Sequence, residues 1–163
     1  MTQVLVAAGS NVEPERHLAA AMRDLAQAFP GARFSTAYRN SAVGFDGDDF
    51  LNLVVAFDTT LGPDAIVAKL HRIEARCGRG RDAPKWAPRS MDLDLLLYGD
   101  LVGEGPGYRL PRPDLLRRAY MLGPAAQLAP AMRHPVEGCT LGELWARFDR
   151  DAHPLTPVQL PAP

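Results

Sequence analysis

The order in which apolar residues repeat along the chain limits the folds that this sequence can adopt. Four segments have the apolar or alternating pattern of β-strands, and two have the 3.6-residue repeat of amphipathic helices. In chain order these are strand 3–9, helix 9–29, strand 32–40, strand 50–59, helix 62–78 and strand 91–99. The order βαββαβ predicts an α+β fold with a ferredoxin-like core, in which a mostly antiparallel sheet packs its helices on one side.

Each predicted helix has one apolar stripe and a proline near its start, at Pro14 and Pro63. Asn11 or Glu13 is a candidate cap for the first helix. The residues expected to face the core are Leu18, Met22, Leu25 and Phe29 in the first helix, and Ile66, Leu70, Ile73 and Cys77 in the second. Both helices are therefore expected to pack one side on the sheet.

The chain beyond about residue 101 is rich in proline and is expected to extend this core. We predict a strand near residues 108–111 and short helices at 114–122, 122–129 and 141–148. Prolines recur after about residue 152, which argues against packed structure in the tail. No repeat or shift in composition marks a boundary, so residues 1–163 are expected to form one domain.

Charge and cysteine content exclude several classes of protein. The net charge is −1 and the pI is about 6.4, so no overall field attracts nucleic acid or an anionic membrane. Cys77 and Cys139 have no metal-ligand spacing, which favours a reducing compartment over a disulfide scaffold or zinc site. Without a signal-like N-terminus or a membrane-length apolar segment, the chain is expected to be cytoplasmic.

The last predicted strand of the core carries two acidic residues, Asp92 and Asp94. At about 3.3 Å per residue, a spacing of two puts both carboxylates on one face, about 7 Å apart. Buried like charges are costly unless a cation compensates them. The pair therefore indicates either a solvated strand end or a site for a divalent cation.

A basic segment precedes the acids. Residues 71–90 contain six Lys or Arg against two acidic residues, an excess of four positive charges. Mg²⁺ binds one or two carboxylates together with substrate phosphates, and the arginine fork matches phosphate oxygens. Trp86 offers a flat face for stacking, although a tryptophan alone is more often a core plug and a basic loop alone is usually just solvated. Together these features favour a polyphosphate–Mg²⁺ site.

A resemblance to one enzyme family extends over most of the chain. The segment KWAPRSMDLDLLLYG, residues 85–99, resembles the signature of 6-hydroxymethyl-7,8-dihydropterin pyrophosphokinases of folate biosynthesis. Shorter matching pieces follow the family's order: GSN at 9–11, YRNSAVG at 38–44, FLN at 50–52, RIE at 72–74 and RRAYML at 117–122. The resemblance implies transfer of pyrophosphate from ATP to the pterin hydroxymethyl group, with release of AMP.

The resemblance also implies roles for individual residues. It assigns two Mg²⁺ ions to Asp92 and Asp94, and catalysis to Arg79, Arg89, Asp92 and Asp94. The residues implied for ATP are His71, Glu74, Arg81, Trp86, Arg89, Leu95, Arg112 and Arg118. Those implied for the pterin are Asn40, Val43, Phe50, Asn52, Trp86 and Tyr120. The implied partners are these two small molecules, with no nucleic acid or membrane, and the enzyme is expected to be a monomer.

Strand geometry supports part of the pterin site, because Phe50 and Asn52 alternate with leucines and share one face. A ring and an amide suit a flat heterocycle with mixed hydrogen-bonding edges. Without the resemblance, Phe50 could equally be a core residue. Likewise, His71 and Glu74 could lie on an exposed helix face. The loop from residue 78 to 88 is expected to close over the phosphates when ligands bind.

The sequence departs from the family pattern at several positions. Arg112 stands where a histidine is usual, and Tyr120 where phenylalanine is frequent. Ser41 and Ala42 occupy positions where prolines are common. These changes leave a paralogue that acts on a modified pterin as one alternative. A second is a ferredoxin-like nucleotide- or RNA-binding module without catalysis, although its predicted strands lack an aromatic RNP1-like pattern. A protein-binding role for the basic segment explains the acids least well.

Overall fold

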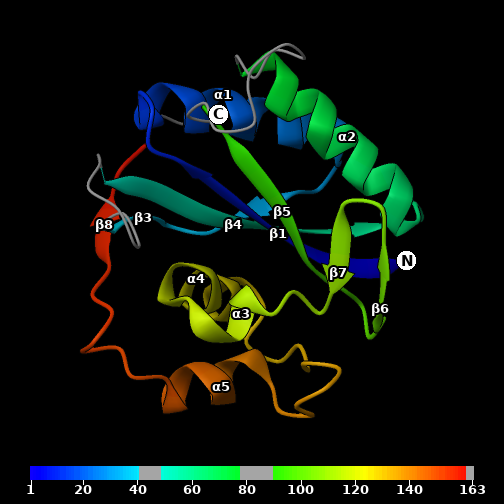
Figure 1. Cartoon of the computed structure of the whole chain (residues 1–163), viewed down its shortest axis with the longest axis vertical. Helices are drawn as coiled ribbons and strands as arrows, with labels where there is room; N and C mark the ends of the chain where they lie inside the picture. The colour runs from blue at the N-terminus through cyan, green and yellow to red at the C-terminus, as the bar shows by residue number, and fades with distance from the viewer. Residues whose placement is uncertain (41–48, 78–89, 161–163) are drawn as a thin grey trace.

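An antiparallel sheet runs through the centre of the computed structural model, which describes residues 1–40, 49–77 and 90–160 (Figure 1). Its elements in chain order are β1 (Thr2–Ser10), α1 (Pro14–Ala28), β2 (Arg33–Phe34), β3 (Ala37–Asn40), β4 (Phe50–Thr59), α2 (Pro63–Arg76), β5 (Asp92–Tyr98), β6 (Gly103–Gly105), β7 (Tyr108–Leu110), α3 (Asp114–Arg117), α4 (Ala119–Leu128), α5 (Leu141–Arg147) and β8 (Thr156–Val158). The sheet has the order β5-β1-β4-β3-β8, with β2 also paired to β4. The hairpin of β6 and β7 stands apart from it.

Helices cover both faces of the sheet, which corrects the expectation that they lie on one side (Figure 1). Helices α1 and α2 pack on one face around Leu18, Leu25 and Ile66. Helices α4 and α5 pack on the other around Leu122 and Leu141. The reason is that β1 and β4 are buried almost continuously rather than at alternate residues, so each face needs its own cover.

The predicted helical stripes are confirmed, because all eight of their apolar side chains are buried. The first helix begins at Pro14, as expected, and its cap position is Glu13, although no side chain caps it. The second helix begins at Pro63. The mixed α and β composition and the antiparallel sheet are also as predicted.

The predicted strand at 32–40 is interrupted at Ser35. The Ser35 hydroxyl accepts a hydrogen bond from the Val54 N–H, and the Ser35 N–H donates to the Val54 carbonyl, both at 2.9 Å. A side chain therefore replaces part of the backbone ladder, and two short strands, β2 and β3, result. The predicted strand near 108–111 is present as β7.

The C-terminal region differs from the prediction in two ways. The break between the first two short helices is at Arg118, where the backbone is extended, rather than near Leu122. The proline-rich tail is also not free of packing, because β8 pairs antiparallel with β3 through Ala37 and Val158. The tail can do this because β8 is an edge strand. One side of an edge strand has no neighbouring strand, so the N–H that a proline lacks is not needed there. No helix in the described ranges is both long and apolar enough for a membrane span.

Candidate active site

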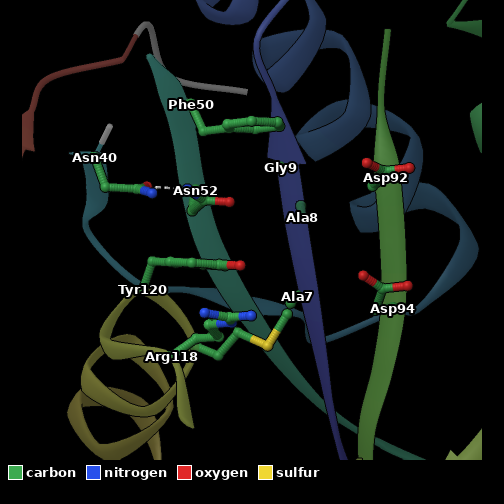
Figure 2. A pocket seen from close by; sticks show the side chains of 11 residues that line it. Ala7, Ala8, Gly9, Asn40, Phe50, Asn52, Asp92, Asp94, Arg118 and Tyr120 are labelled. Carbon is green, nitrogen blue, oxygen red and sulfur yellow. Dashed lines mark hydrogen bonds between the residues drawn. The ribbon is translucent and has the colours of Figure 1, made fainter. Parts of the chain in front are cut away.

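Small residues in the middle of β1 hollow out one face of the sheet. Gly9 lies opposite Asn52 of β4 on one side and Asp92 of β5 on the other. A Cβ on Gly9 would lie 2.4 Å from the Asn52 amide oxygen, so a side chain there would have to displace that amide. Ala7, two residues earlier, lies opposite Asp94. The result is a cavity of about 280 Å³ whose floor is β1 and whose walls are β4 and β5 (Figure 2).

Asp92 and Asp94 line one side of this cavity. Both are half-buried, and Leu93 between them is buried on the opposite face among the α1 and α2 side chains. The spacing of two thus places the carboxylates together, as expected (Figure 2). Glu74 of α2 fixes the strand between them, because its Oε2 accepts a hydrogen bond from the Leu93 N–H at 2.9 Å.

A β-bulge in β5 places the positively charged side chain of Arg112 next to the two aspartates. Val6 pairs with Leu95 and Leu5 with Leu97, so Leu96 is the extra residue. The Leu96 carbonyl accepts a hydrogen bond from the Arg112 N–H at 3.0 Å, which brings this arginine to the cavity's edge. Its NH1 lies 3.6 Å from the Asp94 Oδ1.

The opposite wall of the cavity combines two aromatic rings with two amides (Figure 2). Asn52 is buried and its amide nitrogen donates a hydrogen bond to the Asn40 side-chain oxygen. Phe50 and Tyr120 reach toward the same space from β4 and α4. Burial raises the pKa of the Tyr120 phenol, although the Arg118 guanidinium acts in the opposite direction. The hydroxyl therefore stays protonated near neutral pH and can donate a hydrogen bond.

Three residues assigned to ATP lie away from the cavity. Leu95 is buried in the core beneath α1 and α2, so its side chain faces away from the acids. Glu74 is also buried, which rules out the exposed helix face considered for it. His71 is exposed on α2 and lies beside the turn of the β6–β7 hairpin, where a Cβ on Gly107 would approach the ring to 3.4 Å.

Other predicted site residues are either brought together or not described. The cavity unites Asn40, Phe50, Asn52, Asp92, Asp94, Arg118 and Tyr120, with Arg112 beside Asp94. Val43, Arg79, Arg81, Trp86 and Arg89, together with the loop expected to close at 78–88, lie outside the described residues. Sequence reasoning missed the lining residues Ala7, Ala8 and Met121. The signal for the first two was the run of small residues in an otherwise bulky buried strand.

The acids suit a cation that arrives with phosphate. Within residues 1–40, 49–77 and 90–160, no three His, Cys, Asp or Glu side chains are grouped so as to hold a metal ion. Two carboxylates alone fit Mg²⁺, which completes its six ligands with phosphate oxygens and water. Asp92 and Asp94 therefore fit the ion expected for them.

Comparison with known proteins gives a consistent result. The family model described as 7,8-dihydro-6-hydroxymethylpterin-pyrophosphokinase (HPPK) matches residues 5–130. A Pseudomonas aeruginosa protein named 2-amino-4-hydroxy-6-hydroxymethyldihydropteridine pyrophosphokinase is 39% identical over 149 residues, which is 88% of this chain and 90% of that protein. An Aquifex aeolicus protein of the same name is 32% identical over 83% of this chain and 86% of its own length.

Solved structures share the fold. A crystal structure of HPPK-DHPS in complex with substrates superposes with a TM-score of 0.69 at 10% identity over 93% of this chain. Wild-type Plasmodium falciparum HPPK-DHPS with pteroate gives a TM-score of 0.67 at 11% identity over 90% of the chain. The chain spans less than half of each solved chain, 44% and 42% respectively.

Proposed function

The chain belongs to the 7,8-dihydro-6-hydroxymethylpterin-pyrophosphokinase family, and we propose that it transfers pyrophosphate from ATP to 6-hydroxymethyl-7,8-dihydropterin in folate biosynthesis. The hydroxymethyl oxygen forms a bond to the β-phosphorus of ATP and releases its proton to solvent, the bond from that phosphorus to the α-phosphate oxygen breaks, and AMP leaves with that oxygen. The observation that carries the proposal is the cavity in which two carboxylates face an aromatic and amide wall across a floor of small residues.

The wall opposite the acids is the proposed pterin site. Asn52 gives one amide hydrogen to Asn40 and has a second hydrogen and an oxygen for the edge of a heterocycle. Phe50 and Tyr120 supply ring faces for stacking. A pterin held here has its hydroxymethyl group directed across β1 toward the acids. Val43 and Trp86 complete the proposed set.

The acid wall is the proposed nucleotide and metal site. Asp92 and Asp94 would hold two Mg²⁺ ions, which when bound neutralise the phosphates and polarise the β-phosphorus. Arg118 lines the same cavity and offers a fork for phosphate oxygens. Arg79, Arg81 and Arg89 are proposed to add further positive charge.

Positioning is the main task of the other residues. The strands that carry Asn52 and Asp92 both pair with β1 at Gly9, so the two walls of the cavity have a fixed separation. Fixed orientation of both substrates can supply a large share of a rate enhancement. His71, Glu74 and Leu95 remain proposed for the nucleotide, Leu95 through its backbone and Glu74 through its hold on β5.

We infer that residues 2–98 form a ferredoxin-like core. The support is that β5, β1, β4 and β3 are neighbours in the sheet in that order, each antiparallel to the next, and that α1 and α2 lie on the same face. Free cysteines at positions 77 and 139 support a reducing, cytoplasmic location. A monomer is proposed because the sequence has no exposed heptad stripe of the kind that joins chains in a coiled coil.

The test is formation of AMP from ATP and 6-hydroxymethyl-7,8-dihydropterin with Mg²⁺. Asp92→Asn and Asp94→Asn should each lower turnover by about a hundredfold or more while the fold survives, since charge stabilisation is lost but no core volume is. The matched control is Asp100→Asn, at an exposed position just beyond β5. Near-normal turnover of either cavity variant at saturating Mg²⁺ would reject the assignment.

The same assay separates the alternatives. A paralogue would form AMP only with a modified pterin as acceptor. A nucleotide- or RNA-binding module would bind single-stranded RNA and form no AMP with any pterin.

A further inference from the structure

One arginine is shared between a cavity acid and an acid outside the cavity. Arg112 NH1 lies 3.6 Å from the Asp94 Oδ1, and its NH2 lies 3.4 Å from the Asp114 Oδ2. All three side chains are about one-third exposed, at 30%, 33% and 37%. Charges in such an environment are incompletely screened, so the guanidinium lowers the negative potential at Asp94.

The Arg112 guanidinium is held near Asp94, but not all of its hydrogen-bond donors are used by the described residues. The backbone N–H of Arg112 donates to the bulged Leu96 carbonyl, which fixes where the side chain starts. Neither ion-pair distance is that of a tight charge-assisted hydrogen bond, which is about 2.7–2.9 Å. In the described part of the chain the Arg112 Nε is buried without a hydrogen-bond partner. The side chain therefore has donor capacity left for another oxygen.

We propose that Arg112 is a resident counter-ion of Asp94 that competes with the metal until nucleotide binds. With the cavity empty, the guanidinium offsets part of the charge that a divalent cation needs. When metal and nucleotide arrive together, phosphate oxygens accept the Arg112 donors, and Asp94 is released to the metal. The inference rests on the proposed function, because it takes Asp92 and Asp94 as the metal pair.

Asp114 has a defined part in this arrangement. It draws the guanidinium in the opposite direction from Asp94, so its removal lets Arg112 pair more fully with Asp94. Loss of Asp114 should therefore weaken metal binding to the empty enzyme only when Arg112 is present. A general effect of negative charge would persist without Arg112, and a double-mutant cycle separates the two.

The experiment is a Mn²⁺ titration of the nucleotide-free enzyme, followed by electron paramagnetic resonance of the free ion. Arg112→Gln should tighten Mn²⁺ binding by about three- to tenfold, the size expected for a partly exposed charge pair. Arg112→Lys keeps the charge and should stay near wild type. The matched control is Arg109→Gln, which removes an equally charged but exposed side chain paired with Glu104.

A second arm adds a non-hydrolysable ATP analogue. There the Arg112→Gln variant should lose its advantage and bind the analogue more weakly than wild type, because its phosphate contact is gone. Asp114→Asn should weaken Mn²⁺ binding in the wild-type background and have little effect beside Arg112→Gln.

The outcomes separate the inference from its premise. Equal Mn²⁺ affinities for Arg112→Gln, Arg109→Gln and wild type would overturn the counter-ion role. A change of equal size in Arg112→Lys would also overturn it, because a disturbed loop rather than a lost charge would then be the cause. If Asp92→Asn and Asp94→Asn leave Mn²⁺ binding unchanged, the metal pair itself is wrong, and the proposed function fails with it.

Discussion

Gly9 shows how one residue without a side chain determines what the cavity can hold. It is the cross-strand neighbour of both Asn52 and Asp92, so any atom added there enters the space between the two walls. The nearest atom is the amide oxygen of Asn52, a buried residue whose amide nitrogen donates a hydrogen bond to the Asn40 side-chain oxygen. A methyl group at this position cannot be accommodated without turning that amide.

We therefore expect Gly9→Ala to weaken pterin binding as much as Asn52→Ala does, with little effect on ATP affinity. An unpaired polar edge in a closed pocket costs about 1–3 kcal/mol, which isothermal titration with the pterin would measure. The control is Gly62→Ala, because nothing lies within 4 Å of a Cβ at that position. Unchanged pterin affinity in both cavity variants would move the pterin site elsewhere.

At the scale of elements, the edge strand β5 is held in place by a side chain from α2. The buried Glu74 carboxylate accepts the Leu93 N–H, directly between the two acids. Such a bond replaces the ladder partner that an edge strand lacks. Glu74 is thus a positioning residue for the acid pair, which an assignment from spacing alone does not reveal.

Glu74→Ala should lower the free energy of unfolding by about 1–3 kcal/mol, because the Leu93 N–H is left buried and unpaired. It should also raise amide exchange in β5 selectively. Urea unfolding and hydrogen exchange measure the two effects. Arg72→Ala, an exposed position on the same helix, is the control and should change neither. Unaltered exchange across β5 in Glu74→Ala would show that the strand does not depend on this carboxylate.

The turn before α5 depends on a neutral histidine. His134 is buried, and its Nδ1 accepts hydrogen bonds from the N–H groups of Val136 and Glu137. Burial lowers the pKa of His134, and the Glu137 charge only partly opposes this. The unfolded chain, with a pKa near 6.5, therefore takes up a proton at a higher pH than the folded one does.

It follows that the free energy of unfolding falls as the pH drops through about 6.5 toward the lower folded pKa, and is greatest above that range. Urea unfolding between pH 7.5 and 5.5 should show this slope. His134→Gln cannot gain the proton and should have a flatter profile, whereas His153→Gln, at an exposed position, should keep the wild-type slope. Parallel profiles for wild type and His134→Gln would contradict the assignment.

Patterns within one segment predicted the fold well, and patterns that join distant segments did not. The stripe from Leu18 to Phe29 and the shared face of Asp92 and Asp94 follow from periodicity alone. The break between β2 and β3 at Ser35 depends on hydrogen bonds to Val54. The carbonyl of the bulged Leu96 accepts its hydrogen bond from the Arg112 N–H. Neither partner can be identified from local residues, because the bonds exist only once the strands are paired. The cavity floor was missed for a related reason, since small residues have meaning only beside their larger cross-strand neighbours.

At the scale of the whole molecule, the C-terminal tail connects the two layers. After α5 it crosses from the α4 and α5 side and adds β8 to the free edge of β3 (Figure 1). Val158 and Leu160 pack against the core under α1 and α2. On the way, residues 152–155 line a second cavity of about 260 Å³, which shares Asn40, Arg118 and Tyr120 with the proposed active site.

Ending the chain after Ala152 should therefore affect both the free energy of unfolding and the proposed pterin site. Lost burial of Val158 and Leu160 should lower the free energy of unfolding by about 1–3 kcal/mol, and β3 would become a bare edge. Because β3 carries Asn40, pterin affinity should fall as well, whereas Mn²⁺ binding at the acids of β5, on the opposite edge of the sheet, should be preserved. Val158→Ser should reproduce part of the stability loss, and Gln159→Ala, which is exposed, should not. Equal loss of pterin and Mn²⁺ binding on truncation would instead mean that the tail maintains the fold as a whole and has no particular role at β3.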